Sequence, residues 1–251
     1  MGIVNVTPDS FSGDGLTDPE AAVARGLSMA AAGAAVIDVG GESTRPGHTP
    51  VEAAEEIARV VPVVAGLARA GASVSIDTSK LEVAEAAVEA GATMVNDIWG
   101  LQRAPGIARL AAERELHLVL MHNQTGHEYR TDLLEAIKQA LRRSIAAALE
   151  AGVPAERVIV DPGIGFGKTA EHNLVVLRRL DELQELGQPI LVGASRKSFL
   201  GRIFGQEMEQ RIWGTAAAVA VAVTRGATWV RVHDVPEMSA VARVAEGLRR
   251  G

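Results

Sequence analysis

The sequence predicts an α/β fold: one (β/α)8 barrel, the TIM barrel, forming a single domain over residues 1–251. Short apolar runs rich in β-branched residues alternate with alanine-rich segments. The runs are almost continuously hydrophobic, which is typical of parallel strands buried on both faces. Eight such units in this length give about 31 residues per unit, the scale of a (β/α)8 barrel.

Each predicted strand is one of these apolar runs, ending in a polar or glycine-rich turn. In chain order they are Ile3–Val6, Ala35–Val39, Ala72–Ile76, Ala92–Val95, Leu116–Met121, Val158–Val160, Ile190–Val192 and Thr228–Val232.

Several predicted helices are bounded by a side chain that can cap the first turn and by a glycine that can end the last. Five pairs of boundaries fit this pattern: Asp18-Pro19 to Gly33, Thr49-Pro50 to Gly71, Thr78 or Ser79 before Lys80–Ala90 to Gly91, Thr131 or Asp132 to Gly152, and a start near Gln206 to Gly226.

An open doubly wound sheet is the alternative to the barrel, and the polar residues at the strand ends distinguish the two. These residues are Asn5, Asp38, Asp77, Asn96, His122, Asp161, Lys197 and His233. Strands of an open sheet lie about 4.8 Å apart, so the outermost of eight could not share one ligand. A closed barrel brings all eight strand ends around one mouth, which favours the barrel.

Composition excludes several classes of protein. A net charge of −6 argues against binding nucleic acid through a general positive field. The absence of cysteine excludes disulfides, thiolate catalysis and cysteine-ligated metals. No apolar run approaches the roughly 20 residues of a membrane helix. With no basic-then-apolar leader either, we expect a cytoplasmic protein without nucleic-acid or membrane partners.

Acidic and amide side chains follow three of the predicted strands: Asp77, Asn96 and Asp161. Each alone could be a helix cap or a turn former. Together they offer both acceptors and donors, which suits a flat heterocycle with an amino-pyrimidinone edge. Asp38 could be a further ligand or a polar group hydrogen-bonded to its neighbours inside the barrel.

A cationic set falls at other strand ends. Lys197 stands in Ser195-Arg196-Lys197-Ser198, Arg45 follows Ser43-Thr44, and Arg231 and His233 are two residues apart, so they share one face of an extended chain. Together these groups could bind a phosphate or pyrophosphate. Arg231 or His233 alone could equally have a surface or capping role.

The stretch Gly163-Ile164-Gly165-Phe166-Gly167-Lys168-Thr169 resembles a phosphate-binding loop only superficially. Pro162 stands where the Walker pattern requires glycine, and Lys168 stands where a Rossmann motif requires one. We interpret it as a flexible loop that presents Phe166 to a ring, or more simply as a strand-to-helix turn.

Five motifs in order make the chain resemble the dihydropteroate synthase family over nearly its whole length. They are Asn5-Val6-Thr7-Pro8-Asp9-Ser10-Phe11-Ser12, Gly40-Gly41-Glu42-Ser43-Thr44-Arg45-Pro46-Gly47, Asp161-Pro162-Gly163 through Lys168, Ser195-Arg196-Lys197-Ser198 and Arg231-Val232-His233-Asp234. The resemblance implies condensation of 7,8-dihydropterin pyrophosphate with 4-aminobenzoate to 7,8-dihydropteroate, in folate biosynthesis. It also implies a homodimer and inhibition by sulfonamides, which mimic aminobenzoate.

The resemblance also implies roles for individual residues. Catalysis would involve Asp9, Asp77, Asp161 and Lys197; pterin binding Asp77, Asn96, Ile98, Met121, Asp161 and Lys197; pyrophosphate binding Asn5, Thr44, Arg45, Arg231 and His233; aminobenzoate binding Pro46, Phe166, Lys197 and Ser198; and Mg²⁺ binding Asn5.

The chain departs from the family pattern in its first loop, where Phe11-Ser12-Gly13-Asp14-Gly15 places the acid one position late. We therefore assign the catalytic role to Asp9 rather than Asp14. The family also leads us to expect a segment ahead of the first strand. Two alternatives keep the pterin pocket: a folate-binding methyltransferase domain, which would not need the Ser-Thr-Arg-Pro-Gly and Ser-Arg-Lys-Ser motifs, and a non-catalytic pterin-binding paralogue.

Overall fold

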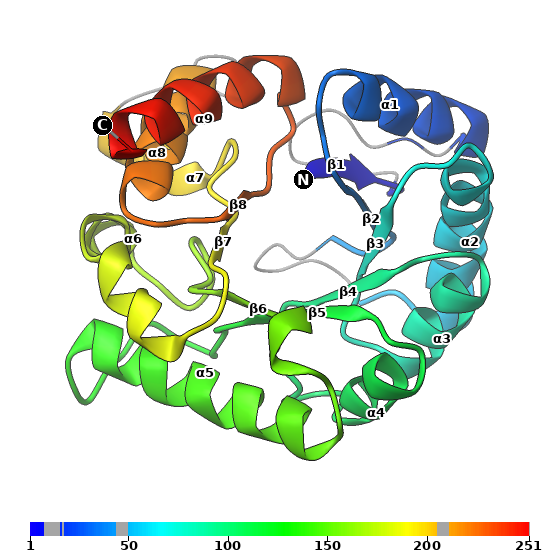
Figure 1. Ribbon diagram of the computed structural model, residues 1–251, viewed down its shortest axis with the longest axis horizontal. Helices are drawn as coiled ribbons and strands as arrows, with labels where there is room; N and C mark the ends of the chain where they lie inside the picture. Colours follow the sequence, from blue (N-terminus) through cyan, green and yellow to red (C-terminus); the bar gives the residue numbers. More distant parts are fainter. Residues whose placement is uncertain (8–15, 17, 44–49, 205–210, 251) are drawn as a thin grey trace.

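The computed structural model describes residues 1–7, 16, 18–43, 50–204 and 211–250, and within them helices surround a ring of parallel strands (Figure 1). The strands are β1 Gly2–Asn5, β2 Ile37–Gly40, β3 Val74–Asp77, β4 Met94–Asp97, β5 His117–Met121, β6 Val158–Asp161, β7 Leu191–Val192 and β8 Trp229–Val230. Each overlaps one of the eight predicted runs. The predicted (β/α)8 barrel is confirmed.

The barrel consists of one long hydrogen-bonded sheet and one short one. Strands β1 to β6 pair in chain order, and β7 pairs with β8. Single parallel bridges, Val160 to Ile190 and Gly2 to Val232, join the two sheets at both edges. Because the second bridge connects the first and last strands, the sheet closes on itself and no strand is left with an open edge.

Side chains alternate between the outside and the inside of this closed sheet. The outward-facing residues of the strands join the main core under the helices, as Val95, Leu118 and Leu120 do. A second, separate cluster fills the inside near the amino ends of the strands: Met1, Val36, Met94, Val119, Ile159 and Leu191, with Trp229 packed against it. This apolar plug makes the barrel a filled core and leaves the opposite end for polar groups.

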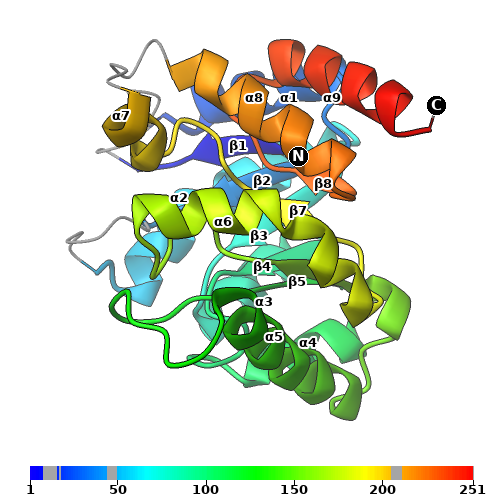
Figure 2. The same cartoon turned by 90° about the vertical axis from the view of Figure 1, so that its left-hand side faces the viewer.

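The helices lie outside the strands and follow them around the ring. They are α1 Pro19–Ala31, α2 Ala53–Arg69, α3 Leu81–Glu89, α4 Gly106–Glu113, α5 Leu133–Glu150, α6 Ala170–Arg178, α7 Ser198–Phe204, α8 Arg211–Thr224 and α9 Val235–Arg250, with 3-10 turns η1 Ala155–Arg157 and η2 Leu180–Leu186. Seen from the side, α8 and α9 cover one end of the stack of strands, and α4 and α5 cover the other (Figure 2).

Two of the predicted helix caps are confirmed. Asp18 accepts a hydrogen bond from Glu20 N ahead of α1, and Asp132 accepts from the backbone of Leu134 and Glu135 at the start of α5. The predicted start of α2 at Thr49-Pro50 is wrong, because the helix begins at Ala53 behind Glu52, which caps it with backbone alone. Helix α8 begins at Arg211, whereas the expected start near Gln206 lies outside the described residues.

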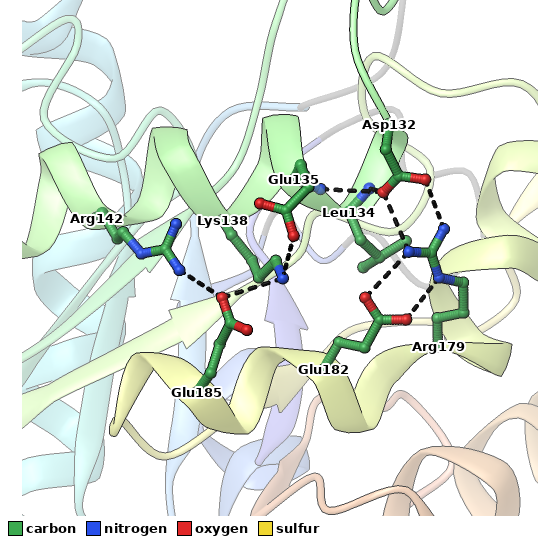
Figure 3. A network of polar contacts seen from close by, with 8 residues as sticks. All are labelled: Asp132, Leu134, Glu135, Lys138, Arg142, Arg179, Glu182 and Glu185. Carbon is green, nitrogen blue, oxygen red and sulfur yellow. Dashed lines mark hydrogen bonds and ion pairs between the residues drawn. The ribbon is translucent and has the colours of Figure 1, made fainter.

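A network of ion pairs fastens α5 to η2 on the outer surface (Figure 3). The Arg179 guanidinium lies between Asp132, 2.7 Å away, and Glu182, 2.6 Å away. One helical turn further along, Lys138 bridges Glu135 and Glu185, and Arg142 also reaches Glu185. The network therefore ties the cap of α5 to the segment that follows α6.

Among the helices of the described residues, none is both long and apolar enough to cross a membrane.

Candidate functional site

The carboxyl ends of the strands place a set of polar side chains inside one mouth of the barrel. Asn5, Asp77 and Asp161 are the last residues of β1, β3 and β6, and Asn96 is the penultimate residue of β4. In β4 and β6 the inward residues two positions earlier, Met94 and Ile159, belong to the apolar plug. The period of two therefore explains why the polar residues face the same interior space.

Asp38 on β2 is the centre of this polar set. Its side chain is fully buried, and its Oδ2 accepts from Asn96 Nδ2 at 3.1 Å and from Arg231 Nε at 2.5 Å. Arg231 Nη2 also donates to Asp77 Oδ2 at 2.6 Å. The interpretation of Asp38 as a hydrogen-bonded group inside the barrel is therefore confirmed, and it orients two predicted ligands of the substrate.

Burial raises the pKa of two carboxyl groups at the mouth, Asp77 and Asp161. Desolvation raises the pKa of Asp77, and the nearby Arg231 opposes the rise. Desolvation also raises the pKa of Asp161, and a hydrogen bond of 2.7 Å from Gly163 N to its Oδ1 opposes it. A buried carboxylate with incomplete compensation is a common feature of a functional site.

Lys197 lies between the carboxylates and the loop after β6. Its Nζ donates to Ile164 O at 2.5 Å and stands 4.0 Å from the centre of the Phe166 ring. Burial lowers the pKa of Lys197 to about 7, although the charge of Asp161 acts in the opposite direction. The structure thus brings together the predicted pterin residues and the ring predicted to contact aminobenzoate.

The loops after β7 and β8 hold one another. Arg196 forms a two-pronged ion pair with Asp234, in which Nε lies 3.0 Å from Oδ2. The backbone N–H of His233 donates to Ser195 Oγ at 3.1 Å, and His233 Nδ1 lies 2.9 Å from the same oxygen. The Ser195 hydroxyl that accepts this N–H can also donate to Nδ1, and in that tautomer Nε2 carries the proton and can donate to an anion.

A cavity of about 500 Å³ opens at this mouth. Three predicted site residues line it, Asp77, Ile98 and Phe166, together with residues of the loops after β4 and β5. Met121, also predicted to bind pterin, is the buried last residue of β5, and Ser198 is the exposed first residue of α7. The volume is in the range of small-molecule sites.

The glycines of the loop after β6 allow the backbone to pack closely against the loop after β5. A Cβ on Gly163, whose φ is +72°, would lie 2.0 Å from His122 O. A Cβ on Gly167, at φ +55°, would lie 2.7 Å from Gln124 O. Only glycine permits these contacts.

Four of the predicted site residues, Asp9, Thr44, Arg45 and Pro46, lie outside the described residues, as does Asp14. Within the described chain no group of three His, Asp or Glu side chains could hold a metal ion. Asn5 can offer one amide oxygen, so Mg²⁺ would fit here only with most of its ligands supplied by water and by a phosphate-bearing substrate.

Sequence reasoning missed several polar contacts at the mouth. Beside the cavity, Lys80 Nζ bonds Val51 O at 2.6 Å and Glu56 at 2.5 Å, and it also pairs with Glu42. Glu42, Val51 and Glu56 belong to the unit of β2 and α2, Lys80 belongs to the next unit, and none of the four follows a predicted strand directly. Their only sequence signal is that Glu56 is a charged residue on the buried stripe of α2.

Comparisons with known proteins agree with this arrangement. The family model described as pterin binding enzyme matches residues 1–233. A dihydropteroate synthase of Clostridium beijerinckii is 47% identical over 249 residues, covering 98% of this chain and 92% of that protein. One of Bacillus subtilis is 44% identical over 250 residues, covering 99% and 87%.

Solved structures give the same result. The dihydropteroate synthase of Clostridium difficile, solved in the presence of pteroic acid, superposes with a TM-score of 0.95 at 45% identity, covering all of this chain and 96% of that one. That of Xanthomonas albilineans with 4-aminobenzoic acid has a TM-score of 0.92 at 43% identity, covering 100% and 93%. That of Yersinia pestis with a sulfonamide drug has a TM-score of 0.95 at 41% identity, covering 100% and 94%. The chain belongs to the pterin-binding enzyme family, and within it to the dihydropteroate synthases.

Proposed function

We propose that this protein is a dihydropteroate synthase, a transferase of folate biosynthesis. It condenses 7,8-dihydropterin pyrophosphate with 4-aminobenzoate and releases pyrophosphate and 7,8-dihydropteroate. The observation that carries the proposal is the convergence of Asp77, Asn96, Asp161, Lys197 and Arg231 on one barrel mouth, joined by the contacts of Arg231 and Lys197.

The pterin would bind over the buried carboxylates. An amino-pyrimidinone edge presents N–H donors beside a carbonyl acceptor, so it needs carboxylates and at least one donor on the protein. Asp161 supplies acceptors, and Asn96 and Lys197 supply donors. Asn96 is held by Asp38, which orients its amide before the substrate arrives.

The reaction requires an electrophile that gains positive charge as pyrophosphate leaves. Around the mouth, the carboxyl groups of Asp38, Asp77 and Asp161 lie among the cations Arg231 and Lys197. A carboxylate that is fixed beside the pterin before the bond breaks would stabilise a cationic pterin methylene. No covalent intermediate with the protein is required.

The departing pyrophosphate would be held by Arg231 and His233, together with Thr44 and Arg45. The described ion pairs of Arg231 use its Nε and one Nη2 hydrogen, and a guanidinium carries five N–H groups, so it retains donors for an anion. Mg²⁺ would be carried mainly by the pyrophosphate, with Asn5 as a protein ligand, and would neutralise charge on the leaving group.

4-Aminobenzoate would bind at the Phe166 end of the mouth, with Pro46, Lys197 and Ser198. The Phe166 ring offers a flat face to the arene, and the Lys197 ammonium lies against that ring. A sulfonamide of similar shape would compete for the same place. The Yersinia pestis relative was solved with such a drug.

We further propose that two copies associate through α6, α7 and α8. A groove of about 400 Å³ between these helices is lined largely by apolar residues, among them Leu174, Phe199 and Val221. Trp213, 74% exposed, and Val221, 41% exposed, lie eight residues apart on the same face of α8. An exposed apolar stripe of this kind is typical of a subunit interface.

The activity is tested by mixing the protein with dihydropterin pyrophosphate and Mg²⁺, with and without 4-aminobenzoate. Pyrophosphate release that depends on 4-aminobenzoate, with dihydropteroate as product, would establish the synthase. Tight pterin binding without turnover would instead support the non-catalytic paralogue, and no binding would refute the pterin assignment. Removing Mg²⁺ with a chelator tests whether the reaction needs the proposed metal, because turnover should then fall.

A further inference from the structure

The loop between β6 and α6, residues 162–169, is held by three side chains that donate to its backbone carbonyls. Lys197 donates to Ile164 O at 2.5 Å, Lys168 to Phe166 O at 3.0 Å, and Tyr129 Oη to Gly167 O at 2.9 Å. Three carbonyls of this loop therefore accept hydrogen bonds, one from within the loop and two from other parts of the chain. Phe166, whose ring faces Lys197, lies in the middle of this arrangement.

Lys168 is a buried lysine whose hydrogen-bond partners in the described chain are a backbone carbonyl and an imidazole. It is 6% exposed, and its Nζ contacts Phe166 O and His122 Nδ1, the latter at 2.9 Å. Burial lowers the pKa of His122 to about 3, so its ring stays neutral and Nδ1 can accept. His122 is itself fixed to the end of β6, because its backbone N–H donates to Asp161 O at 2.9 Å.

Tyr129 extends the same arrangement toward α6. Its ring lies 6.1 Å from the His122 ring in a stacked orientation and 5.2 Å from the His172 ring edge-on. His172 belongs to the capping box of α6, where its Nδ1 accepts from Thr169 N. Tyr129 thus connects the loop after β5 with Gly167 and with the first turn of α6.

We propose that Lys168, His122 and Tyr129 form a brace that positions Phe166 for 4-aminobenzoate. The three are positioning residues, and the proposal rests on the proposed function. The brace fixes the carbonyls of Phe166 and Gly167, while Lys197 fixes the carbonyl of Ile164 on the other side of Phe166. Since aminobenzoate is expected to contact Phe166 while the pterin contacts the strand ends, loss of the brace should weaken one substrate more than the other.

The sharpest variant is Tyr129→Phe, which keeps both ring contacts and removes only the hydrogen bond to Gly167 O. We expect KM for 4-aminobenzoate to rise roughly two- to tenfold, the equivalent of one hydrogen bond. KM for dihydropterin pyrophosphate should change by less than about twofold. Unchanged values for both substrates, or an equal rise in both, would overturn the proposal.

Lys168→Met removes the second member of the brace and has a matched control in Lys138→Met. Lys138 is also nearly fully buried, at 3% exposure, but it binds Glu135 and Glu185 on the outer surface (Figure 3). Both variants should lower the melting temperature, whereas only Lys168→Met should raise KM for 4-aminobenzoate. The same rise in Lys138→Met would indicate a general loss of stability and refute the positioning role.

Amide hydrogen exchange over residues 163–169 tests the brace without any turnover. Exchange should be faster in Tyr129→Phe and Lys168→Met than in the wild type and unchanged in Lys138→Met. If the wild type makes no dihydropteroate, the proposed function has failed, and this exchange experiment still decides whether the loop is braced. Equal exchange in all four proteins would refute the brace.

Discussion

Replacing Asp38 with alanine should cost stability and activity together. The substitution removes the oxygen that accepts from both Arg231 Nε, at 2.5 Å, and Asn96 Nδ2, at 3.1 Å, at a position with no solvent exposure. Breaking a buried ion pair by removing one partner costs about 3–5 kcal/mol. Arg231 keeps Asp77 as a partner, and the desolvation of Asp38 is relieved, so we expect the lower end, about 3 kcal/mol.

Thermal unfolding measures this cost. In a chain of this length each kcal/mol corresponds to about 2–4 °C, so the melting temperature should fall by about 6–12 °C. Because Asn96 and Arg231 lose their common anchor, kcat/KM should also fall, by about 10- to 100-fold. Asp38→Asn keeps an acceptor oxygen and should show a smaller loss of both.

Ser75→Ala is the matched control. Ser75 pairs with Asp38 across β2 and β3, and its buried Oγ has no hydrogen-bond partner among the described residues. Removing that hydroxyl should change the unfolding free energy by less than about 0.5 kcal/mol. If Ser75→Ala lowers the melting temperature as much as Asp38→Ala does, the cost comes from disturbing the barrel interior, and the role given to the Asp38 hydrogen bonds is refuted.

Three further predictions concern the pH dependence of stability, the surface and the assembly. Burial lowers the pKa of Lys168 from 10.5 to about 7, so between these pH values the unfolded chain binds a proton at this residue that the folded chain does not. The free energy of unfolding should therefore rise with pH, by up to about 1.4 kcal/mol per pH unit. Denaturant unfolding at several pH values should show a flatter rise in Lys168→Met, and an identical slope would contradict the assignment. Asp132→Ala removes both the cap of α5 and a partner of Arg179, so the free energy of unfolding should fall by about 1–2 kcal/mol while kcat stays unchanged. A loss of kcat in a folded variant would show that this ion-pair network affects the active site. Val221→Asp should convert the proposed dimer to a monomer in light scattering, whereas Val244→Asp, at a 66% exposed valine outside the groove, should not. A dimer that survives Val221→Asp would place the interface elsewhere.

The fold could be predicted from the sequence because its signals are local. Strand β6 is an uninterrupted apolar run ending in Asp161, and the α5 cap needs only Asp132 and the next three residues. The start of α2 could not be placed, because a cap made by the backbone of Glu52 leaves no side-chain signal and Pro50 suggested an earlier start. Closure of the ring was predicted from the positions of the polar residues rather than from any one strand.

Several predicted site residues, among them Asp77 and Asp161, lie at strand ends, and their hydrogen-bond partners could not be predicted. Arg231 reaches Asp38 across 193 positions and Asp77 across 154, so these pairs exist only because the barrel closes. The roles of Lys168 and Tyr129 depend on carbonyl directions in a loop with three positive-φ glycines, which the sequence does not determine. Glycines in such a loop indicate unusual backbone geometry, and only the structure shows which atoms they allow to approach.

The two single-residue bridges that close the barrel separate a large sheet, β1 to β6, from a small one, β7 and β8. The two sheets differ in how many hydrogen bonds hold each strand. Strands β1 to β6 share a continuous ladder, whereas β7 and β8 hold one another over two residues and meet the rest of the ring at one bridge on either side. Asp77, Asn96 and Asp161 stand on the large part, while Lys197, Arg231 and His233 follow the small one. Local opening of a fold follows such weak boundaries. The residues proposed to bind the pterin and those proposed to face the departing anion can therefore unfold and exchange at different rates, although they belong to one closed ring.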